Sequence, residues 1–252
     1  MITPLICNYN LPDETDVIYK RLIEDGFTDI LSIDNGSTIR KAISSNLILP
    51  KNIRFSGQAR IGLTYLMDYF PNEFYLIINN SGSLLDNIQY KTVIEEEVFF
   101  LKKNYSNKIG LIISSLKGKS SLKDIPRQHP KNIQKSQTIE SPQLIFYIVS
   151  HELLNKCREE KAAFFNLDLY RGHGIGPELI FIANKNNLIN ICSSKICVDW
   201  EPNKSYKIKN TVESIEEYHK KASTEMTKSF KKKYGFFWEK KFRNASIKNK
   251  IS

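Results

Sequence analysis

The sequence predicts an α/β protein in which a mostly parallel central sheet lies between helices. In the first 115 residues, short apolar runs alternate with amphipathic segments of roughly 10–15 residues, which is the pattern of βαβ units. Apolar residues make up 41% and charged residues 25% of the 252-residue chain, which is an ordinary globular composition. No apolar run approaches the roughly 20 residues that a membrane-spanning helix needs.

Apolar periodicity and turn residues define the elements of the first half. They are expected in the order strand Ile2–Cys7, helix Asp13–Asp25, strand Thr28–Ile33, strand Asn52–Phe55, helix Gly57–Tyr69, strand Phe74–Ile78, helix Thr92–Lys103 and strand Lys108–Ser114. In the first helix, Ile18 and Leu22 share a face, and Gly26 ends the helix. In the second helix, Ile61 and Tyr65 share a face in the same way.

A polar stretch, residues 116–142, separates this half from the rest. It contains Pro126, Pro130 and Pro142 and is expected to be a long loop, either a lid over a site or a disordered insertion. The later elements are expected to be strand Gln143–Val149, a helix capped by Ser150 that ends at Arg158, a helix that Pro177 begins and Asn187 ends, strand Ile189–Val198, and one or two helices from Val212 onward. We therefore expect one domain over residues 1–210 and a helical extension over 211–252.

The positive charge of the chain is concentrated in that extension. Residues 219–252 hold eleven of the 37 basic and two of the 27 acidic residues, so they carry nine of the ten net positive charges. The same segment contains the aromatic residues Phe230, Tyr234, Phe236, Phe237, Trp238 and Phe242. Three interpretations follow: a solvated helix whose aromatic side chains pack on the body, a contact with an anionic membrane surface, or, least favoured, nucleic-acid binding.

The four cysteines follow neither a disulfide framework nor a zinc-ligand spacing. No basic segment followed by an apolar one, as in a secretory signal, is visible at the start of the sequence. The expectation is a cytoplasmic protein with reduced thiols, which would be peripheral on the inner membrane face if the extension contacts lipid.

Polar clusters follow three of the expected strands at their carboxyl ends. They are Asn8–Asn10, Asp34–Ser37 and Asn79–Ser81. Each cluster alone is an ordinary turn, but ligands of parallel sheets bind beyond the carboxyl ends of the strands. A fourth segment, Gly172–Gly176, is a glycine-rich turn whose spacing does not match a dinucleotide fingerprint.

These four segments, in this order, resemble the nucleotide-sugar glycosyltransferases of the GT-A type, most closely glycosyltransferase family two. The matching segments are Ile6-Cys7-Asn8-Tyr9-Asn10, Ile33-Asp34-Asn35-Gly36-Ser37, Leu76-Ile77-Ile78-Asn79-Asn80-Ser81 and Gly172-His173-Gly174-Ile175-Gly176-Pro177-Glu178-Leu179. The resemblance covers roughly Ile2 to Trp200, and its Asp-Asn-Gly-Ser segment is the most specific part.

The resemblance implies a nucleotide site over the first strand ends. Asp34 would accept a hydrogen bond from the base, which is uracil in many relatives, so a UDP-sugar is the expected donor. The residues implied to bind the nucleotide are Asn8, Asn10, Asp34, Asn35, Ser37, Arg60, Asn79, Asn80 and Ser81. Strand-end turns suit this task because they hold donors and acceptors on a rigid frame.

One position departs from the family pattern. Ser81 stands where the family places a metal-binding Asp, and a hydroxyl is a poor ligand for Mg²⁺ or Mn²⁺. Three alternatives remain open. The metal is held by Asp86 or Asp199 with phosphate oxygens, or a cation such as Arg171 or Lys204 replaces it, or the domain binds without catalysing.

The resemblance also implies where the acceptor binds and which residue acts as base. Glu178 is the expected general base, kept ionised by the start of its helix, and Asp168 is the second choice. Arg171 and His173 are expected to contact the acceptor. The implied protein is an inverting glycosyltransferase that adds sugar to a glycan or glycolipid in cell-surface polysaccharide or glycolipid synthesis. The alternative is a GT-A-like module that binds a nucleotide sugar or a partner without turnover.

Overall fold

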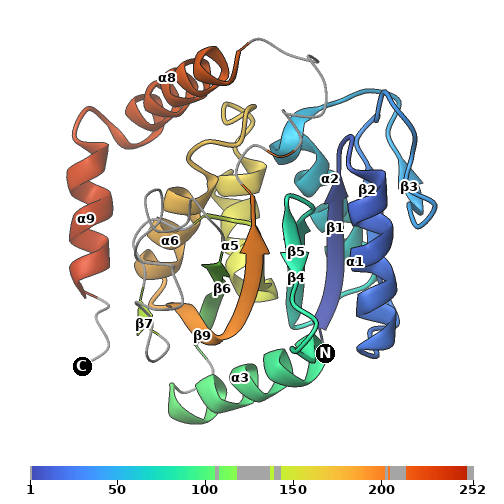
Figure 1. Ribbon diagram of the computed structural model, residues 1–252. Coiled ribbons are helices and arrows are strands. Elements are labelled where there is room, and N and C mark those ends of the chain that lie inside the picture. The colour runs from blue at the N-terminus through green and yellow to red at the C-terminus, as the bar shows by residue number, and fades with distance from the viewer. Residues whose placement is uncertain are drawn as a thin grey trace.

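A mixed nine-stranded sheet forms the centre of the described part of the chain (Figure 1). The computed structural model describes residues 2–105, 108–117, 137–138, 143–201, 204 and 214–248. The strands are β1 Ile2–Asn8, β2 Leu31–Asp34, β3 Leu47–Ile48, β4 Phe74–Asn79, β5 Gly82–Leu84, β6 Ile109–Lys117, β7 Gln137–Thr138, β8 Phe146–Ser150 and β9 Ile189–Trp200. The helices are α1 Pro12–Glu24, α2 Arg54–Tyr69, α3 Tyr90–Asn104, α5 His151–Glu159, the 3₁₀ turn η3 Ala163–Phe165, α6 Ile175–Lys185, α8 Ile215–Tyr234 and α9 Trp238–Lys248.

The strands lie in the order β3-β2-β1-β4-β8-β6-β9-β5, and β7 pairs with β9. The pairs β2–β3, β1–β2, β1–β4 and β6–β9 are parallel, as the alternation of strands and helices predicts. The pairs that involve β8, β5 and β7 are antiparallel, so the sheet as a whole is mixed. The α/β architecture with helices on the sheet is confirmed.

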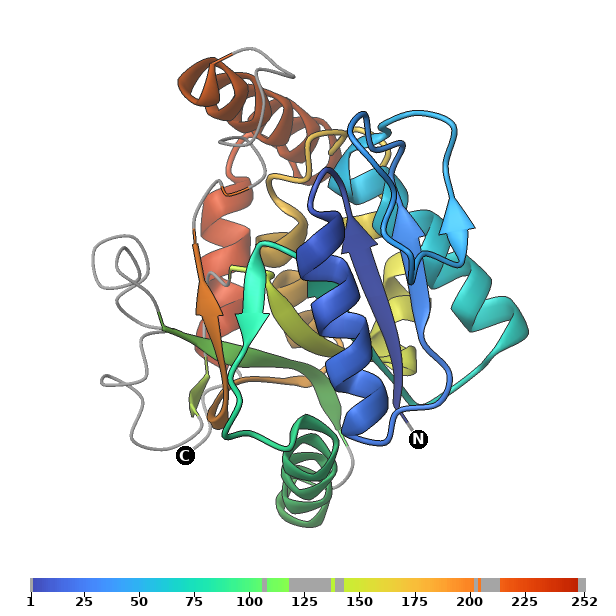
Figure 2. The same cartoon turned by 45° about the vertical axis from the view of Figure 1, so that its right-hand side comes forward.

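Helices cover both faces of the sheet (Figure 2). Successive side chains of a strand point to opposite faces, so Leu5 of β1 joins one core cluster and Ile6 the other. Helices α1 and α3 pack on the side of Ile6, whereas α2, α5 and α6 pack on the side of Leu5. The contact of α2 with β1 is close at Gly62, where an added Cβ would lie 2.6 Å from a methyl carbon of Leu5.

The C-terminal helices α8 and α9 pack against the same side of the body as α6. Phe230 of α8 is completely buried, and Trp238 and Phe242 of α9 lie against it with ring centroids 4.9 and 5.1 Å away. Ser214 caps α8 by accepting a hydrogen bond from the amide of Glu217. No helix of the described residues is long and apolar enough to span a bilayer. The domain boundary expected near residue 210 lies outside the described residues.

The strand expected at Asn52–Phe55 is absent, because α2 begins at Arg54. Side-chain acceptors direct the chain into the helix at this point. The amide of Arg54 donates to Asn52 Oδ1 at 2.7 Å, and the amide of Ile53 donates to Asn35 Oδ1 at 2.9 Å. Such local bonds compete with strand pairing, and β3 forms earlier instead, at Leu47–Ile48.

Other elements differ in detail from the expectation. The helix expected from Pro177 begins two residues earlier, at Ile175, after Gly174 in a left-handed conformation with φ 92°. Within the polar stretch 116–142, its first two residues continue β6, and Gln137–Thr138 form β7. The remainder of that expected loop lies outside the described residues.

Candidate functional site

Polar side chains at the carboxyl ends of β1 and β2 bond to one another. Asn8 Nδ2 donates to Asp34 Oδ2 at 2.9 Å, and the Ser37 amide donates to Asp34 Oδ1 at 2.8 Å. The side chains of Asn8 and Asp34 are buried. The Asp34 carboxylate was expected to accept a hydrogen bond from the nucleotide base. It instead accepts these two hydrogen bonds and so stabilises the turn that follows β2.

Asn10, which is also buried, links the two strand ends. It adopts a left-handed conformation (φ 56°), and its amide donates to Ser37 Oγ at 2.9 Å. The amide of Thr38 donates in turn to Asn10 Oδ1 at 2.8 Å. We call the set Asn8, Asn10, Asp34, Asn35, Ser37 and Asn80 the polar shelf. Ser37 and the neighbouring Gly36 are half-exposed, so they form the accessible rim of the shelf.

The end of β4 contributes to the shelf through Asn80. Asn80 Nδ2 donates to Asn8 Oδ1 at 2.7 Å and to Thr15 Oγ1 at 3.0 Å. Asn79 lines the adjoining cavity, and its Oδ1 accepts from the amide of Ser81 at 3.2 Å. The structure thus brings the three predicted polar clusters to one edge of the sheet.

Asn35 connects the shelf to the start of α2. Its Nδ2 donates to Asn52 Oδ1 at 3.1 Å and to the Arg54 carbonyl at 3.2 Å. Arg60 lies six residues further along α2 and is half-buried. No hydrogen bond joins Arg60 to the shelf residues as the structure describes them.

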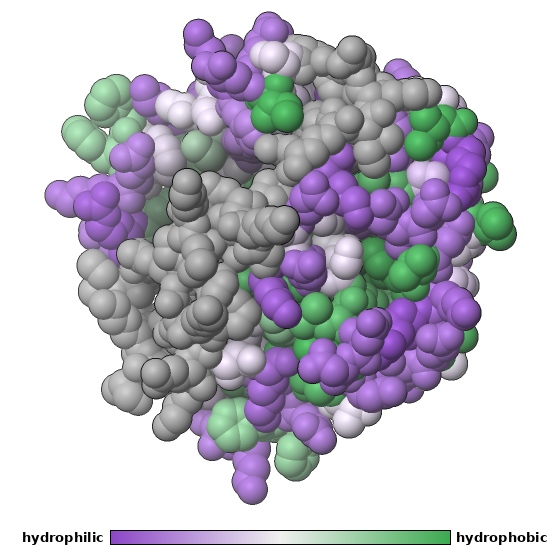
Figure 3. Space-filling view, in the orientation of Figure 1, coloured by the Kyte–Doolittle hydropathy of each residue, from purple (hydrophilic) through white to green (hydrophobic). Residues whose placement is uncertain are grey.

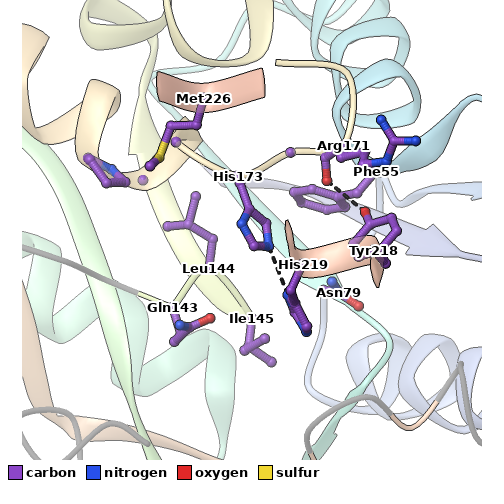
Figure 4. A pocket seen from close by; sticks show the side chains of 14 residues that line it. Phe55, Asn79, Gln143, Leu144, Ile145, Arg171, His173, Tyr218, His219 and Met226 are labelled. Carbon is purple, nitrogen blue, oxygen red and sulfur yellow. Dashed lines mark hydrogen bonds between the residues drawn. The ribbon is translucent and has the colours of Figure 1, made fainter. Parts of the chain in front are cut away.

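A cavity of about 390 Å³ lies beside the shelf (Figure 4). Its walls are the end of β4, residues 143–145, the glycine-rich turn and α8. His173 of the turn and His219 of α8 point toward each other, with His173 Nε2 and His219 Nδ1 3.2 Å apart. Among the described residues, the side chains that line this cavity include no carboxylate.

Contacts with α8 fix the glycine-rich turn. Arg171 forms an ion pair with Glu225, and the Tyr218 hydroxyl donates to the Arg171 carbonyl at 2.8 Å. Burial lowers the pKa of His173, and the neighbouring His219 lowers it further, while Glu225 acts in the opposite direction. The His173 imidazole is therefore neutral near pH 7 and can accept a proton.

Glu178, expected to be the base, lies in the core rather than at the cavity. Its side chain is 0% exposed. Its carboxylate accepts from the Ala163 amide (2.7 Å), Asn166 Nδ2 (3.1 Å), Lys233 Nζ (2.8 Å) and the Tyr234 hydroxyl (2.5 Å). Because these donors surround the carboxylate, Glu178 joins η3, α6 and α8, and we do not place the base there.

Asp168, the second choice for the base, is exposed and forms an ion pair with Lys232 of α8 at 3.1 Å. It does not line the cavity. Of the predicted acceptor residues, Arg171 and His173 both do.

The carboxylates considered as metal ligands do not converge. Asp86 and Asp199 are exposed, and Ser81 is half-buried. No group of three or more His, Cys, Asp or Glu side chains suited to a metal ion occurs within the described ranges. Lys204, considered as a replacement cation, pairs with Glu14 at 2.9 Å. The residues at the family's metal position therefore do not fit a divalent ion, which prefers anionic oxygen ligands.

Sequence reasoning missed the contribution of α8 to this site. Tyr218, His219 and Met226 line the cavity. From the sequence, this part of the chain is expected to belong to the helical extension, with no site residue in it. His219 stands out in the sequence as one of only four histidines. No spacing connects it with His173, because α8 brings the two together only in the tertiary structure.

Comparison with solved structures shows the fold. Glucosyl-3-phosphoglycerate synthase from Mycobacterium tuberculosis, in complex with Mn²⁺, UDP-glucose and phosphoglyceric acid, matches with a TM-score of 0.57 and 10% identity over 91% of this chain and 79% of that chain. The same enzyme with Mn²⁺, UDP and phosphoglyceric acid gives 0.54 and 12% over 93% and 78%. A further mycobacterial protein gives 0.53 and 10% over 91% and 74%.

No protein-family model and no curated protein matches the sequence. At these identities the structural likeness shows the fold alone, an α/β fold of the GT-A type, and it does not single out family two.

Proposed function

We propose that this protein is a glycosyltransferase that moves a sugar from a nucleotide-sugar donor to an acceptor hydroxyl. One observation carries the proposal: in a GT-A-type fold, the polar shelf at the ends of β1, β2 and β4 adjoins a cavity of about 390 Å³. The nucleotide would lie on the shelf and the sugar in the cavity. This arrangement follows the rule that ligands of α/β sheets bind beyond the carboxyl ends of parallel strands.

The donor we propose is a UDP-sugar, with a hexose as the transferred group. The solved structures with this fold contain UDP or UDP-glucose, which supports the choice of nucleotide. In this proposal, the half-exposed rim at Gly36 and Ser37 contacts the nucleoside. Asp34 and Asn8 hold that rim from beneath rather than bonding to the base.

For the chemistry we propose an inverting displacement with His173 as proton acceptor. The acceptor hydroxyl attacks the anomeric carbon, the bond from that carbon to the diphosphate oxygen breaks, and the hydroxyl proton passes to the neutral imidazole. His173 lines the cavity, and its lowered pKa keeps one ring nitrogen unprotonated near pH 7. Arg171, fixed by Glu225, is placed beside the acceptor.

The acceptor we propose is a glycan or glycolipid of the cell surface, met by a cytoplasmic protein at the inner membrane face. The loop between α8 and α9 exposes Phe236 (74%) and Phe237 (71%). Lys231 Nζ lies 4.9 Å from the Phe236 ring centroid, and Lys240 and Arg243 of α9 are exposed. Aromatic rings among cations suit an anionic lipid surface. Figure 3 shows hydrophilic side chains with hydrophobic ones among them where Figure 1 draws these helices.

The test is donor turnover, measured as nucleotide release across the common UDP-sugars with and without candidate acceptors. We expect release with at least one donor, a large loss of rate in His173→Gln, and UDP affinity within about twofold of the wild type. His151→Gln is the matched control, because His151 lies on α5 and bonds to Tyr75 away from the cavity. Tight UDP binding with no turnover of any donor would instead favour the alternative, a binding module.

A further inference from the structure

Arg54, the first residue of α2, is held in a backbone conformation that residues with a Cβ rarely adopt. Its φ is 65°. Two asparagines impose this conformation: the Arg54 amide donates to Asn52 Oδ1 at 2.7 Å, and the Arg54 carbonyl accepts from Asn35 Nδ2 at 3.2 Å. Strained backbone of this kind persists where the surroundings over-determine it and is concentrated at functional sites.

The Arg54 guanidinium lies over the ring of Tyr218, 5.6 Å from its centroid. The Arg171 guanidinium lies 5.9 Å from the same ring. Arg171 is also paired with Glu225, whereas no carboxylate of the described residues lies within ion-pair distance of Arg54. A half-buried guanidinium without a carboxylate is suited to an anionic ligand, and its planar fork matches two phosphate oxygens.

Arg54 stands between the two parts of the proposed site. On one side, the Arg54 carbonyl accepts a hydrogen bond from Asn35, the shelf residue that follows Asp34 at the end of β2. On the other side, its neighbour Phe55 and its partner Tyr218 line the cavity. A nucleotide sugar with its nucleoside on the shelf and its sugar in the cavity carries its diphosphate between them, beside Arg54.

The position where the family binds a metal ion is not suited to hold one in this chain. Ser81 supplies a hydroxyl there, and the described residues contain no cluster of carboxylates suited to a divalent ion. The leaving diphosphate nevertheless needs positive charge as the bond to the anomeric carbon breaks, because the diphosphate departs with the bonding electron pair.

We infer that Arg54, positioned by Asn35 and Asn52 against Tyr218, binds the donor's diphosphate and takes the place of a divalent metal ion; this inference rests on the proposed function above. The strained backbone of Arg54 then serves to position its guanidinium, because an unstrained helix start would direct the side chain away from Tyr218. Arg171 adds a second guanidinium near the same ring, 5.9 Å from its centroid.

The experiment is calorimetric titration of the full chain with UDP and with uridine, each in EDTA and again in Mn²⁺. We expect the wild type to bind UDP with affinities that agree within about twofold in the two conditions. Arg54→Gly is expected to weaken UDP binding roughly 10- to 100-fold, the range for a lost charge-assisted hydrogen bond, and to leave uridine binding unchanged. Its melting temperature should equal or exceed that of the wild type, because glycine adopts φ 65° without strain.

Two further variants make the test specific. Arg54→Lys keeps the charge without the fork and should weaken UDP binding less than the glycine variant does. Arg40→Gln is the control, since Arg40 is an exposed arginine that pairs with Asp13. It should bind UDP like the wild type.

The outcomes separate the two proposals. UDP binding that requires Mn²⁺, or wild-type affinity in Arg54→Gly, overturns the inference about Arg54 and leaves a nucleotide-sugar enzyme in place. A wild type that binds neither UDP, GDP nor ADP in either condition refutes the proposed function itself, whatever the variants do.

Discussion

Replacing Glu178 with glutamine is expected to destabilise the protein before it affects any chemistry. The carboxylate of Glu178 is completely buried and accepts hydrogen bonds from Lys233 Nζ at 2.8 Å and from the Tyr234 hydroxyl at 2.5 Å. Glutamine keeps one acceptor oxygen, so its NH₂ group must face either the two donors to Oε1, Lys233 and Tyr234, or the donors to Oε2, the Ala163 amide and Asn166; in both cases Lys233 loses its buried counter-charge. Burial and the Glu178 charge also raise the pKa of Tyr234, so the tyrosine remains a donor at every accessible pH.

The size of the loss follows from the burial of the pair. Removing one partner of a buried ion pair costs about 3–5 kcal/mol, and the Lys233 side chain is 24% exposed, which places the cost near the lower end, at about 3 kcal/mol. For a chain of this length, each kcal/mol lowers the melting temperature by about 2–4 °C. The melting temperature of Glu178→Gln should therefore fall by about 6–12 °C.

Urea unfolding followed by circular dichroism measures this loss, with the slope of the transition as a check on two-state behaviour. Glu178→Gln combined with Lys233→Met should recover part of the stability, because no charge then remains buried alone. If Glu178→Gln instead unfolded at the wild-type urea concentration while sugar transfer disappeared, Glu178 would be the base and the reasoning here would fail.

Three further predictions concern the glycine-rich turn and the α8–α9 loop. The pKa of His173 is lowered in the folded state from its ordinary value near 6.5, so its contribution to the free energy of unfolding is fully present above pH 6.5 and is lost as the pH falls below it. The urea midpoint should therefore decrease from pH 7.5 to pH 5, and His173→Gln should make this decrease smaller. Gly174→Ala should cost at least about 2 kcal/mol in a thermal melt, because φ is 92° there and the new Cβ would lie 2.8 Å from Met226 Cγ; an unchanged melt would contradict this backbone geometry. Phe236→Ser with Phe237→Ser should reduce sedimentation with phosphatidylserine vesicles at least tenfold, whereas serines at a second exposed pair, Phe99 and Phe100 of α3, should have no effect; equal losses from both pairs would argue against a docking surface.

The sequence was sufficient for elements whose cause is local. A short apolar run marks β1, whose Leu5 and Ile6 face opposite cores, and the four-residue spacing of Ile18 and Leu22 marks α1. It was also sufficient to bring Asn8 and Asp34 together, because parallel neighbouring strands end at the same edge.

The failures share a tertiary cause. Residues 52–55 suggested a strand. The helix starts there instead because the amide of Ile53 donates to Asn35 Oδ1, and Asn35 lies 18 residues earlier in the chain. In the same way, the resemblance of the Gly-Pro-Glu-Leu segment to the family pattern implied that Glu178 is the base. Only the fold reveals that Lys233 and Tyr234, more than fifty residues later, neutralise and enclose it.

The wall that α8 gives to the cavity has a consequence for synthesis of the protein. Tyr218 and His219 follow every other lining element in the chain, so translation supplies them after the sheet and the glycine-rich turn have emerged. A polypeptide that stops short of α8 would lack Tyr218, His219 and Met226, and with them one wall of the cavity and half of its histidine pair. Premature termination would then remove, together with this wall, the buried Phe230 and the residues that bind Glu178.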